Sequence, residues 1–269
     1  FSIGPSRLLI DGETIIDNWT SQDPGETFFA MGSAPRRIQY NFSKGSSYKL
    51  EVEYKWEGRF PAIQIGMHAP DQFDLMQEAV DTAKDADAVI LIVGTNSDWE
   101  TEGNDRSSLA LPSNQDELVQ KICSANNNTV VVLNTGSPCE MPWIDEANSI
   151  LQCWFPGQEF GNSLSDILFG SVNPSGKLPT TFPKKLSDTP AYSTYPGKDL
   201  QMDYEEGLFI GYRWYDRENI EPLFAFGHGL SYTNFEYSNL RAVPPKNESS
   251  VAAFELEVIN KGKLYGKEI

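Results

Sequence analysis

The strongest constraint on the fold is an alternation of strand-like and helix-like stretches that begins near residue 70. Three short apolar runs have the length and residue types of buried strands: Ala88–Val93, Thr129–Leu133 and Ser149–Trp154. Strands without polar alternation are typical of parallel sheets whose two faces are both covered. The pattern therefore predicts an α/β fold, a three-layer αβα sandwich with a mostly parallel sheet.

Helical periodicity lies around these runs. A first helix is expected from a cap at Asp71, a second from a capping-box-like start at Ser113, and a third over Phe160–Phe169 that ends at Gly170. The expected buried stripes are Phe73, Met76, Val80 and Ala83 in the first helix and Leu118, Val119 and Ile122 in the second.

An acidic loop, Trp99–Arg106, follows the first strand and reads W-E-T-E-G-N-D-R. Loops beyond the carboxyl ends of parallel strands are where such folds bind ligands. A carboxyl group there can act as a general acid if burial or neighbouring carboxylates raise its pKa. The residues alone leave two alternatives open: a solvated acidic turn, and a site whose acid is either Glu100 or Glu102.

The strongly negative net charge limits the kinds of ligand that the chain can bind. The formal net charge is −17 and the pI is about 4.5, which excludes nucleic acid and anionic membrane surfaces, because phosphate contacts need clustered Lys and Arg. Neutral ligands such as sugars remain compatible. Cys123, Cys139 and Cys153 lie in apolar stretches and are expected to be buried free thiols.

The segments on either side are β-like. Asp11-Gly12 predicts a hairpin turn, and the strict alternation of Tyr48–Tyr54 predicts a strand with one core face. Further strands are expected at Ile38–Phe42 and Ala62–Met67. We expect three units, a partial β-sandwich (1–69), an α/β domain (70–232) and a truncated β domain (233–269), with the chain cut at both ends.

The aromatic-rich stretch at the end of the α/β unit includes Phe209–Tyr215 and Pro222–Tyr232. Its rings and glycines predict strands that pack against another surface rather than direct substrate contact.

Several segments together resemble family 3 glycoside hydrolases, in particular fungal β-glucosidases. They are A-V-I-L-I-V-G-T-N-S-D-W-E-T-E-G-N-D-R, L-A-L-P, V-V-V-L-N-T-G-S-P, F-P-G-Q-E-F-G-N, F-G-S-V-N-P-S-G-K-L-P-T-T-F-P and P-L-F-A-F-G-H-G-L-S-Y-T. The resemblance covers roughly residues 70 to 240. The stretch before it resembles the lectin-like β-sandwich named after anthrax protective antigen, and the stretch after it resembles the start of a fibronectin type III-like domain.

The resemblance implies that Glu102, in E-G-x-D-R, is the acid/base catalyst of a retaining β-glucosidase. Trp99, Glu100, Asp105 and Arg106 are then supporting residues. Ser97-Asp98-Trp99 matches the tripeptide around the family's nucleophilic aspartate, but that aspartate ends a strand of a separate N-terminal (β/α)8 barrel. Asp98 lies too close to Glu102 in one loop to attack from the opposite face of the sugar.

The expected partners are therefore an oligosaccharide or an aryl or alkyl β-glucoside, and the missing barrel in cis. The fragment alone is expected to be inactive, and the alternative is a non-catalytic carbohydrate-binding or scaffolding protein. A nucleotide-binding domain fits less well, because Gly94–Trp99 lacks the glycine-rich fingerprint. No metal or organic cofactor is implied, since two carboxyl groups complete the chemistry.

The N-terminal segment offers a weaker hypothesis. Trp19, Phe28 and Phe29 can line a distal sugar subsite, with core packing as the alternative. Four sequons, at Asn18, Asn41, Asn127 and Asn247, permit glycosylation. They favour an extracellular location over a cytoplasmic one.

Overall fold

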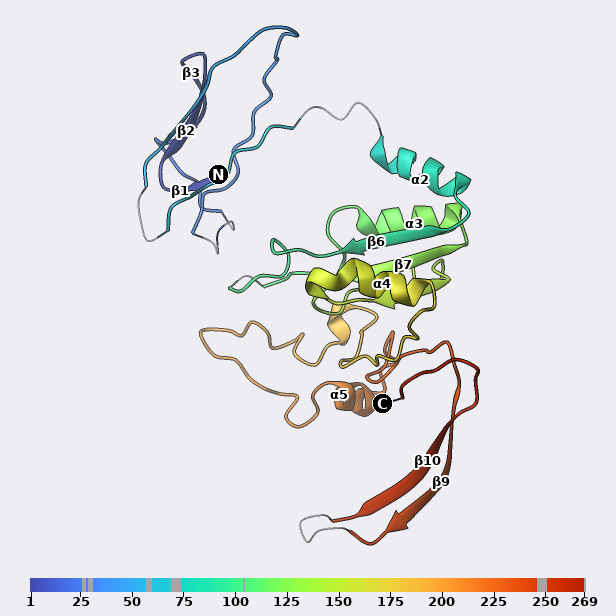
Figure 1. The fold of residues 1–269 in the computed structure, drawn as a ribbon. Coiled ribbons are helices and arrows are strands. Elements are labelled where there is room, and N and C mark those ends of the chain that lie inside the picture. Colours follow the sequence, from blue (N-terminus) through green and yellow to red (C-terminus); the bar gives the residue numbers. More distant parts are fainter. Residues whose placement is uncertain are drawn as a thin grey trace.

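The computed structural model describes residues 1–25, 28, 31–56, 60–68, 74–103, 105–245 and 251–268. Figure 1 shows a β unit at the amino end, an α/β unit in the middle and a long two-stranded ribbon at the carboxyl end. In the described part of the chain, no helix is both long and apolar enough to cross a membrane.

The amino-terminal unit is built from short antiparallel strands. β1 (Ser2–Ile3) pairs with β5 (Ala62–Ile63), and β2 (Ser6–Ile10) lies between β3 (Glu13–Asn18) and β4 (Leu50–Tyr54). The predicted hairpin is confirmed, because Asp11 and Gly12 join β2 to β3 with φ values of 50° and 84°. Two positive φ angles are what a type I′ turn requires.

Two expectations for this unit are wrong. Residues 38–42, all of them described, form no strand, because the rings of Tyr40, Phe42 and Tyr48 pack on one another with centroids 4.9 to 6.1 Å apart. Aromatic residues favour strands through packing on a neighbouring strand, and here the rings supply that packing themselves. The predicted core face of β4 is also exposed, at 53% for Leu50 and 45% for Val52.

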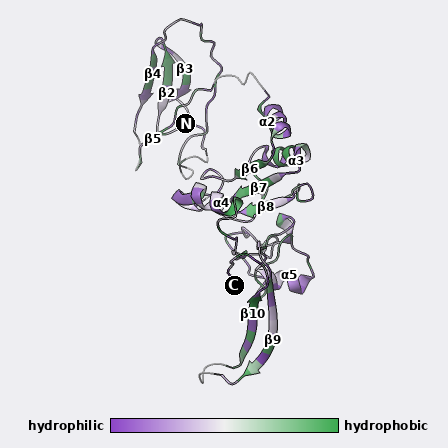
Figure 2. Cartoon of the chain, turned by 45° about the vertical axis from the view of Figure 1, so that its right-hand side comes forward, coloured by the Kyte–Doolittle hydropathy of each residue, from purple (hydrophilic) through white to green (hydrophobic). Residues whose placement is uncertain are grey.

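The α/β unit has a three-stranded parallel sheet in the order β6-β7-β8. Its strands are β6 (Val89–Gly94), β7 (Thr129–Asn134) and β8 (Ser149–Gln152), close to the three predicted runs. α3 (Gln115–Ala125) and α4 (Phe160–Leu168) lie on opposite sides of this sheet in Figures 1 and 2, and α2 (Leu75–Asp85) packs on α3. The predicted α/β class, with helices on both faces, is confirmed.

The core of this unit lies around β7. Val131, Val132 and Leu133 have no exposed surface, and Trp143 is 1% exposed. The indole Nε1 of Trp143 donates a 2.8 Å hydrogen bond to Asp116 Oδ1, which satisfies the polar atom of a buried ring. The core cluster consists of Val93, Leu111, Val119, Cys123, Val131, Leu133, Cys139, Met141, Trp143 and Phe182.

The predicted helix starts fare differently. Asp71 and Phe73 lie outside the described residues, and α2 is capped by Asp74, whose side chain accepts from the Gln77 backbone N–H. Ser113 does not cap α3: it has a φ of 54°, and the helix follows Asn114 with no side-chain cap bond. The Asp116 carboxylate, expected in the capping box, is bound to Trp143 instead.

The aromatic stretch contains a helix where strands were expected. α5 (Tyr212–Glu218) buries Tyr215, and the Arg217 guanidinium lies 4.6 Å from the Phe209 ring centroid and 4.7 Å from that of Trp214. In this stretch the rings therefore pack against the Arg217 guanidinium and the helix buries Tyr215, and no strand pairing is needed. Elsewhere an isolated bridge joins Phe182 to Phe224.

The carboxyl-terminal ribbon consists of β9 (Phe235–Val243) and β10 (Ala253–Asn260), paired antiparallel. Its apolar residues are exposed, with Tyr237 at 56% and its partner Val258 at 45%. A two-stranded ribbon of this kind gains stability only when another surface covers its apolar side chains.

Candidate active site

The three parallel strands end at one edge, where the loops that carry polar residues meet. Gly94 and Asn134 are paired at the ends of β6 and β7. Gln115, the first residue of α3, fixes this corner, because its amide accepts from the Gly94 N–H at 2.7 Å and donates to the Gly94 carbonyl at 2.9 Å. A shallow hollow at this edge is lined by Ile92, Val93, Gly94, Thr95, Asn96, Pro112, Gln115 and Asn134.

Glu100 is the most firmly held carboxylate of the acidic loop. Its side chain is 16% exposed. Oε1 accepts hydrogen bonds from Thr95 Oγ1 at 2.5 Å and from the Gly136 backbone N–H at 3.0 Å. Arg106 Nη1 lies 3.8 Å from the same oxygen. Glu100 is therefore occupied by groups of its own chain.

Glu102 is placed differently, although only one residue separates it from Glu100. It is exposed, and no hydrogen bond or ion pair joins its side chain to another described residue. Gly103 follows with a φ of 79°, a conformation that glycine adopts without strain. The loop thus turns just after Glu102 and leaves this carboxyl group free to meet a ligand.

Asp105 and Arg106 anchor the returning limb of the acidic loop. Arg106 Nη1 donates a 2.7 Å hydrogen bond to Ser137 Oγ, beyond β7. Asp105 is hydrogen-bonded to the Tyr195 hydroxyl, and this bond, with burial and the carboxylate charge, raises the pKa of Tyr195. The structure therefore brings four of the predicted residues, Glu100, Glu102, Asp105 and Arg106, into one fastened loop.

The remaining loop residues have lesser contacts. Trp99 is 38% exposed, and its backbone N–H donates to the Asn96 carbonyl at 3.0 Å. Asp98 is exposed, and its backbone N–H donates to Asn96 Oδ1 at 2.9 Å. Asp98 and Glu102 thus belong to the same short loop.

Cys139 lies near the site but is unsuited to nucleophilic chemistry. Burial, reinforced by the Asp116 carboxylate and opposed by Arg106, raises the pKa of its thiol to about 12. A thiol with so high a pKa is protonated at neutral pH, and the thiolate is the reactive form. All three cysteines are free thiols, as expected, although Cys153 is only half-buried.

The aromatic residues proposed for a distal subsite do not form one cluster. Trp19 is 37% exposed, and the Arg7 guanidinium lies 5.3 Å from its ring centroid. Phe28 is half-buried and packs edge-on against Phe1, with centroids 5.3 Å apart. Phe29 lies outside the described residues. Both described rings therefore contact groups of this chain, and the distal-subsite hypothesis stays a prediction.

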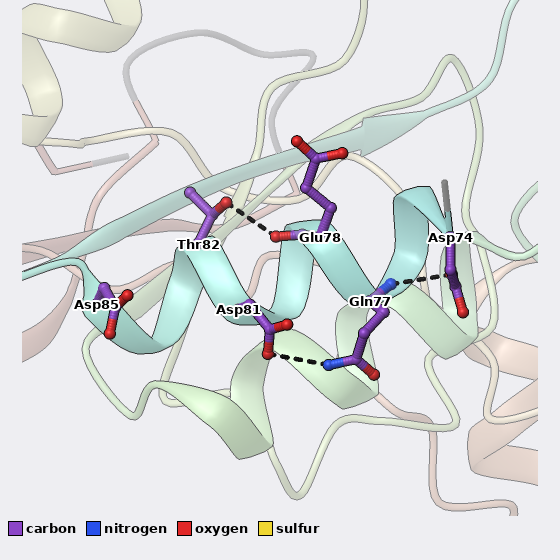
Figure 3. Close-up of a pocket in the computed structure, with 6 residues that line it drawn as sticks. All are labelled: Asp74, Gln77, Glu78, Asp81, Thr82 and Asp85. Atoms are coloured by element: carbon purple, nitrogen blue, oxygen red, sulfur yellow. Dashed lines mark hydrogen bonds between the residues drawn. The ribbon is translucent and has the colours of Figure 1, made fainter. Parts of the chain in front are cut away.

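A second hollow runs along the acidic face of α2 (Figure 3). Its polar groups bond along their own helix: Gln77 Nε2 donates to Asp81 at 2.9 Å, and Thr82 Oγ1 donates to the Glu78 carbonyl at 2.8 Å. Hydrogen bonds from Lys84 and Gln77 lower the pKa of Asp81. This is a solvated helix face, and it contains no residue of the acidic loop.

Sequence reasoning missed the partners that fasten the acidic loop. Thr95 directly follows β6 and Gly136 lies two residues beyond the end of β7, so the rule that placed the loop at this edge also points to them. Tyr195 lies in an irregular segment, and its sequence context carries no signal of the contact with Asp105.

The fold and the loop define the class of protein: a parallel α/β unit with a fastened acidic loop at the ligand-binding edge of its sheet. Comparison with known proteins gives the family. The model of the glycosyl hydrolase family 3 C-terminal domain matches residues 11–232. The chain belongs to this family.

Curated relatives are β-glucosidases. A β-glucosidase of Rhizobium radiobacter is 39% identical over 276 residues, which are 99% of this chain and 34% of that protein. A putative β-glucosidase of Schizosaccharomyces pombe is 42% identical over 280 residues, 99% of this chain and 33% of the relative. The chain thus spans about a third of the length of these relatives.

Solved structures of β-glucosidases are also similar to this chain. The β-glucosidase from Kluyveromyces marxianus in complex with glucose superposes with a TM-score of 0.81 at 31% identity, over 97% of this chain and 36% of that one.

Proposed function

We propose that this chain is the part of a β-glucosidase that carries the acid/base catalyst, Glu102. The observation that carries the proposal is the contrast within the acidic loop. Glu100 is only 16% exposed and is bound by Thr95 and Gly136, whereas Glu102 is exposed and, among the described residues, has no side-chain partner. A catalytic acid must reach the substrate, and Glu102 is the glutamate of this loop that can.

The proposed reaction is retaining hydrolysis by double displacement. One carboxylate attacks the anomeric carbon while Glu102 protonates the departing glycosidic oxygen, which gives a covalent glycosyl-enzyme. Glu102, now a carboxylate, takes a proton from the water that attacks the anomeric carbon and releases β-glucose. The two carboxyl groups must lie about 5–5.5 Å apart on either side of the bond. Asp98 lies in the same loop as Glu102, which does not favour it as the nucleophile.

The nucleophile is therefore assigned to a (β/α)8 barrel of the same protein, which docks against this chain. Two observations support a missing partner: the chain spans about a third of its relatives, and the segment that contains Tyr195 exposes large apolar side chains. Leu200, Tyr204 and Leu208 are 108%, 74% and 86% exposed. Large apolar side chains exposed within one short segment favour an interaction site there.

The substrate, the flanking units and the location complete the proposal. The substrate is a small oligosaccharide or an aryl or alkyl β-glucoside with a non-reducing glucose. Residues 1–69 form part of a protective-antigen-type sandwich, and residues 233–269 start a fibronectin type III-like domain, a role supported by the exposed apolar side chains of β9 and β10. The location is extracellular.

A chimera tests the assignment. This chain replaces the matching segment of the Rhizobium radiobacter enzyme, and the chimera and the 269-residue chain are compared for hydrolysis of an aryl β-glucoside. We expect activity in the chimera alone, with β-glucose as the first product by NMR. Activity in the bare chain would overturn the assignment of the nucleophile to the barrel, and Asp98 would then be the candidate nucleophile. A folded but inactive chimera would favour the carbohydrate-binding or scaffolding alternative.

A further inference from the structure

Glu100 occupies a position that joins three separate parts of the site. Its Oε1 accepts from Thr95, which follows β6, and from the backbone N–H of Gly136, which follows β7. It also faces Arg106 Nη1 at 3.8 Å, on the limb of the acidic loop that returns after Glu102. One carboxylate thus links two strand ends and both limbs of the loop.

The Glu100 carboxylate occupies the space where a side chain at position 136 would stand, so this position accepts only glycine without a shift of its neighbours. A β-carbon at Gly136 would lie 2.4 Å from Glu100 Oε2 and 2.6 Å from Phe155 Cε2. Contacts this short force a neighbour to move. A side chain at position 136 would therefore displace the Glu100 carboxylate or the Phe155 ring.

The other anchors confirm which parts of the loop are fixed. Arg106 is bonded to Ser137 at 2.7 Å, and Asp105 to the Tyr195 hydroxyl. Glu102 lies between the Glu100 anchor and these two, at the exposed turn. Its position is therefore set by its neighbours' bonds and not by bonds of its own.

We propose that Glu100 is a positioning residue, whose carboxylate holds the acidic loop on the ends of β6 and β7 and so fixes where Glu102 meets the glycosidic oxygen. The inference rests on the proposed function, because it concerns the placement of Glu102. Misplacement of a catalytic group by about 1 Å can cost on the order of a hundredfold in rate.

The first test uses the 269-residue chain and does not depend on catalysis. Amide hydrogen exchange at Gly136, whose N–H donates to Glu100 Oε1, is measured in wild type, Glu100→Ala, Glu100→Gln and Asp98→Asn. We expect Glu100→Ala to accelerate exchange at least about tenfold, because the loop opens locally. Glu100→Gln keeps an acceptor oxygen and should fall between. Asp98→Asn removes a charge from the same loop without touching the anchor and should match wild type.

The second test uses the chimera and a series of aryl β-glucosides with good and poor leaving groups. We expect Glu100→Ala to lower kcat about 10- to 100-fold for poor leaving groups and much less for activated ones. KM and the unfolding midpoint should change little. Gly136→Ala keeps the glutamate at position 100 but displaces its carboxylate from the anchor. It should therefore give the same selective loss of kcat on poor leaving groups.

The outcomes separate the two proposals. If Glu102→Gln shows no dependence on the leaving group, the acid assignment itself fails. If Glu102→Gln shows that dependence but Glu100→Ala and Gly136→Ala behave like wild type, the positioning role of Glu100 is wrong. Equal loss by Glu100→Ala on all substrates, with unchanged amide exchange, would also overturn it.

Discussion

The hydroxyl of Tyr195 donates a hydrogen bond to the carboxylate of Asp105, and so joins the acidic loop to an irregular segment far along the chain. The pKa of Tyr195 is raised, first because of this bond and then by burial and the carboxylate charge. The loop that carries Glu102 is thus held from the side of the aromatic segment as well as from the sheet.

Removing this tether should loosen the loop without unfolding the protein. Tyr195→Phe in the chimera should lower kcat on poor leaving groups about 2- to 10-fold, the worth of one ordinary hydrogen bond. Faster exchange of the Gly136 amide, which donates to Glu100 in the acidic loop, is the matching structural readout. Tyr192→Phe, a substitution at an exposed ring of the same segment, is the control, and an unchanged exchange rate at Gly136 would contradict the tether.

Replacing the proposed acid should give a leaving-group-dependent loss. Glu102→Gln should lower kcat/KM of substrates with poor leaving groups by about 10² to 10⁴ and spare kcat/KM of activated aryl glucosides, because only the former need protonation. Loss of the general base also slows hydrolysis of the glycosyl-enzyme, which lowers kcat for every substrate. With Glu102→Ala and an activated substrate, azide should restore turnover, since it attacks the glycosyl-enzyme without a general base. Asp98→Asn serves as the matched control, and failure of azide to form the glucosyl adduct would count against Glu102.

Alkaline pH should destabilise the fold through Cys139. Burial keeps the proton on this thiol up to about pH 12 in the folded state, whereas its ordinary pKa is 9.0. Between these values the unfolded chain binds fewer protons than the folded one, so stability falls as pH rises. Cys139→Ala should remove on the order of 3 kcal/mol of this loss at pH 11. Parallel denaturation curves for both proteins from pH 8 to 11 would refute it.

The four sequons should not be equivalent. Asn18 is 3% exposed, and its Nδ2 donates to the hydroxyls of Ser2, Ser6 and Ser33 at 2.9 to 3.4 Å. A glycan on that nitrogen would displace all three bonds. In a secretory host we expect glycans at the exposed Asn41 and Asn127 and none at Asn18, as measured by peptide mass spectrometry.

The same cluster predicts a stability effect. Asn18→Ala should cost about 1–3 kcal/mol because it removes three buried hydrogen bonds to serine hydroxyls, whereas Asn41→Ala should stay within about 0.5 kcal/mol. A glycan found on Asn18 in folded protein, or equal stability of the two variants, would contradict the structural role of Asn18.

Gly94 should tolerate no side chain. A β-carbon there would lie 2.1 Å from the Asn134 carbonyl oxygen, so Gly94→Ala must push β6 from β7 at the site edge, at a cost of about 1–3 kcal/mol. Gly161→Ala in α4 meets nothing within 4 Å and should stabilise by about 0.4–1 kcal/mol. Urea denaturation distinguishes the two, and equal midpoints would show that the sheet edge yields.

Much of the fold was readable from local pattern. The runs Ala88–Val93 and Thr129–Leu133 became β6 and β7 nearly residue for residue, because a continuous apolar run admits few alternatives to a strand. Burial was predicted correctly for β7 but not for β6, where Ile90 and Ile92 are each 51% exposed. Ser113 failed as a cap because its φ is 54° and the helix begins only after Asn114. Asp116, three residues further on, bonds to the core indole of Trp143. A tertiary contact of that kind leaves no trace in local sequence.

The site was readable only in part. Spacing placed a carboxylate cluster beyond β6, but the residues themselves did not separate Glu100 from Glu102. The difference depends on Thr95 and Gly136, which lie beside Glu100 only after β6 and β7 have paired. The resemblance to a family favoured Glu102, and that assignment stays a prediction.

The sheet beneath the acidic loop is complete once the chain has been made through Gln152, but Tyr195 comes later. Ribosomes add about 5–20 residues per second, and a nascent chain folds from its amino end. For a few seconds of synthesis the described contacts of Glu100 and Arg106 therefore hold the loop without that of Tyr195. The contact between Asp105 and Tyr195, which completes the support of the loop around Glu102, can form only after the segment that contains Tyr195 has left the ribosome.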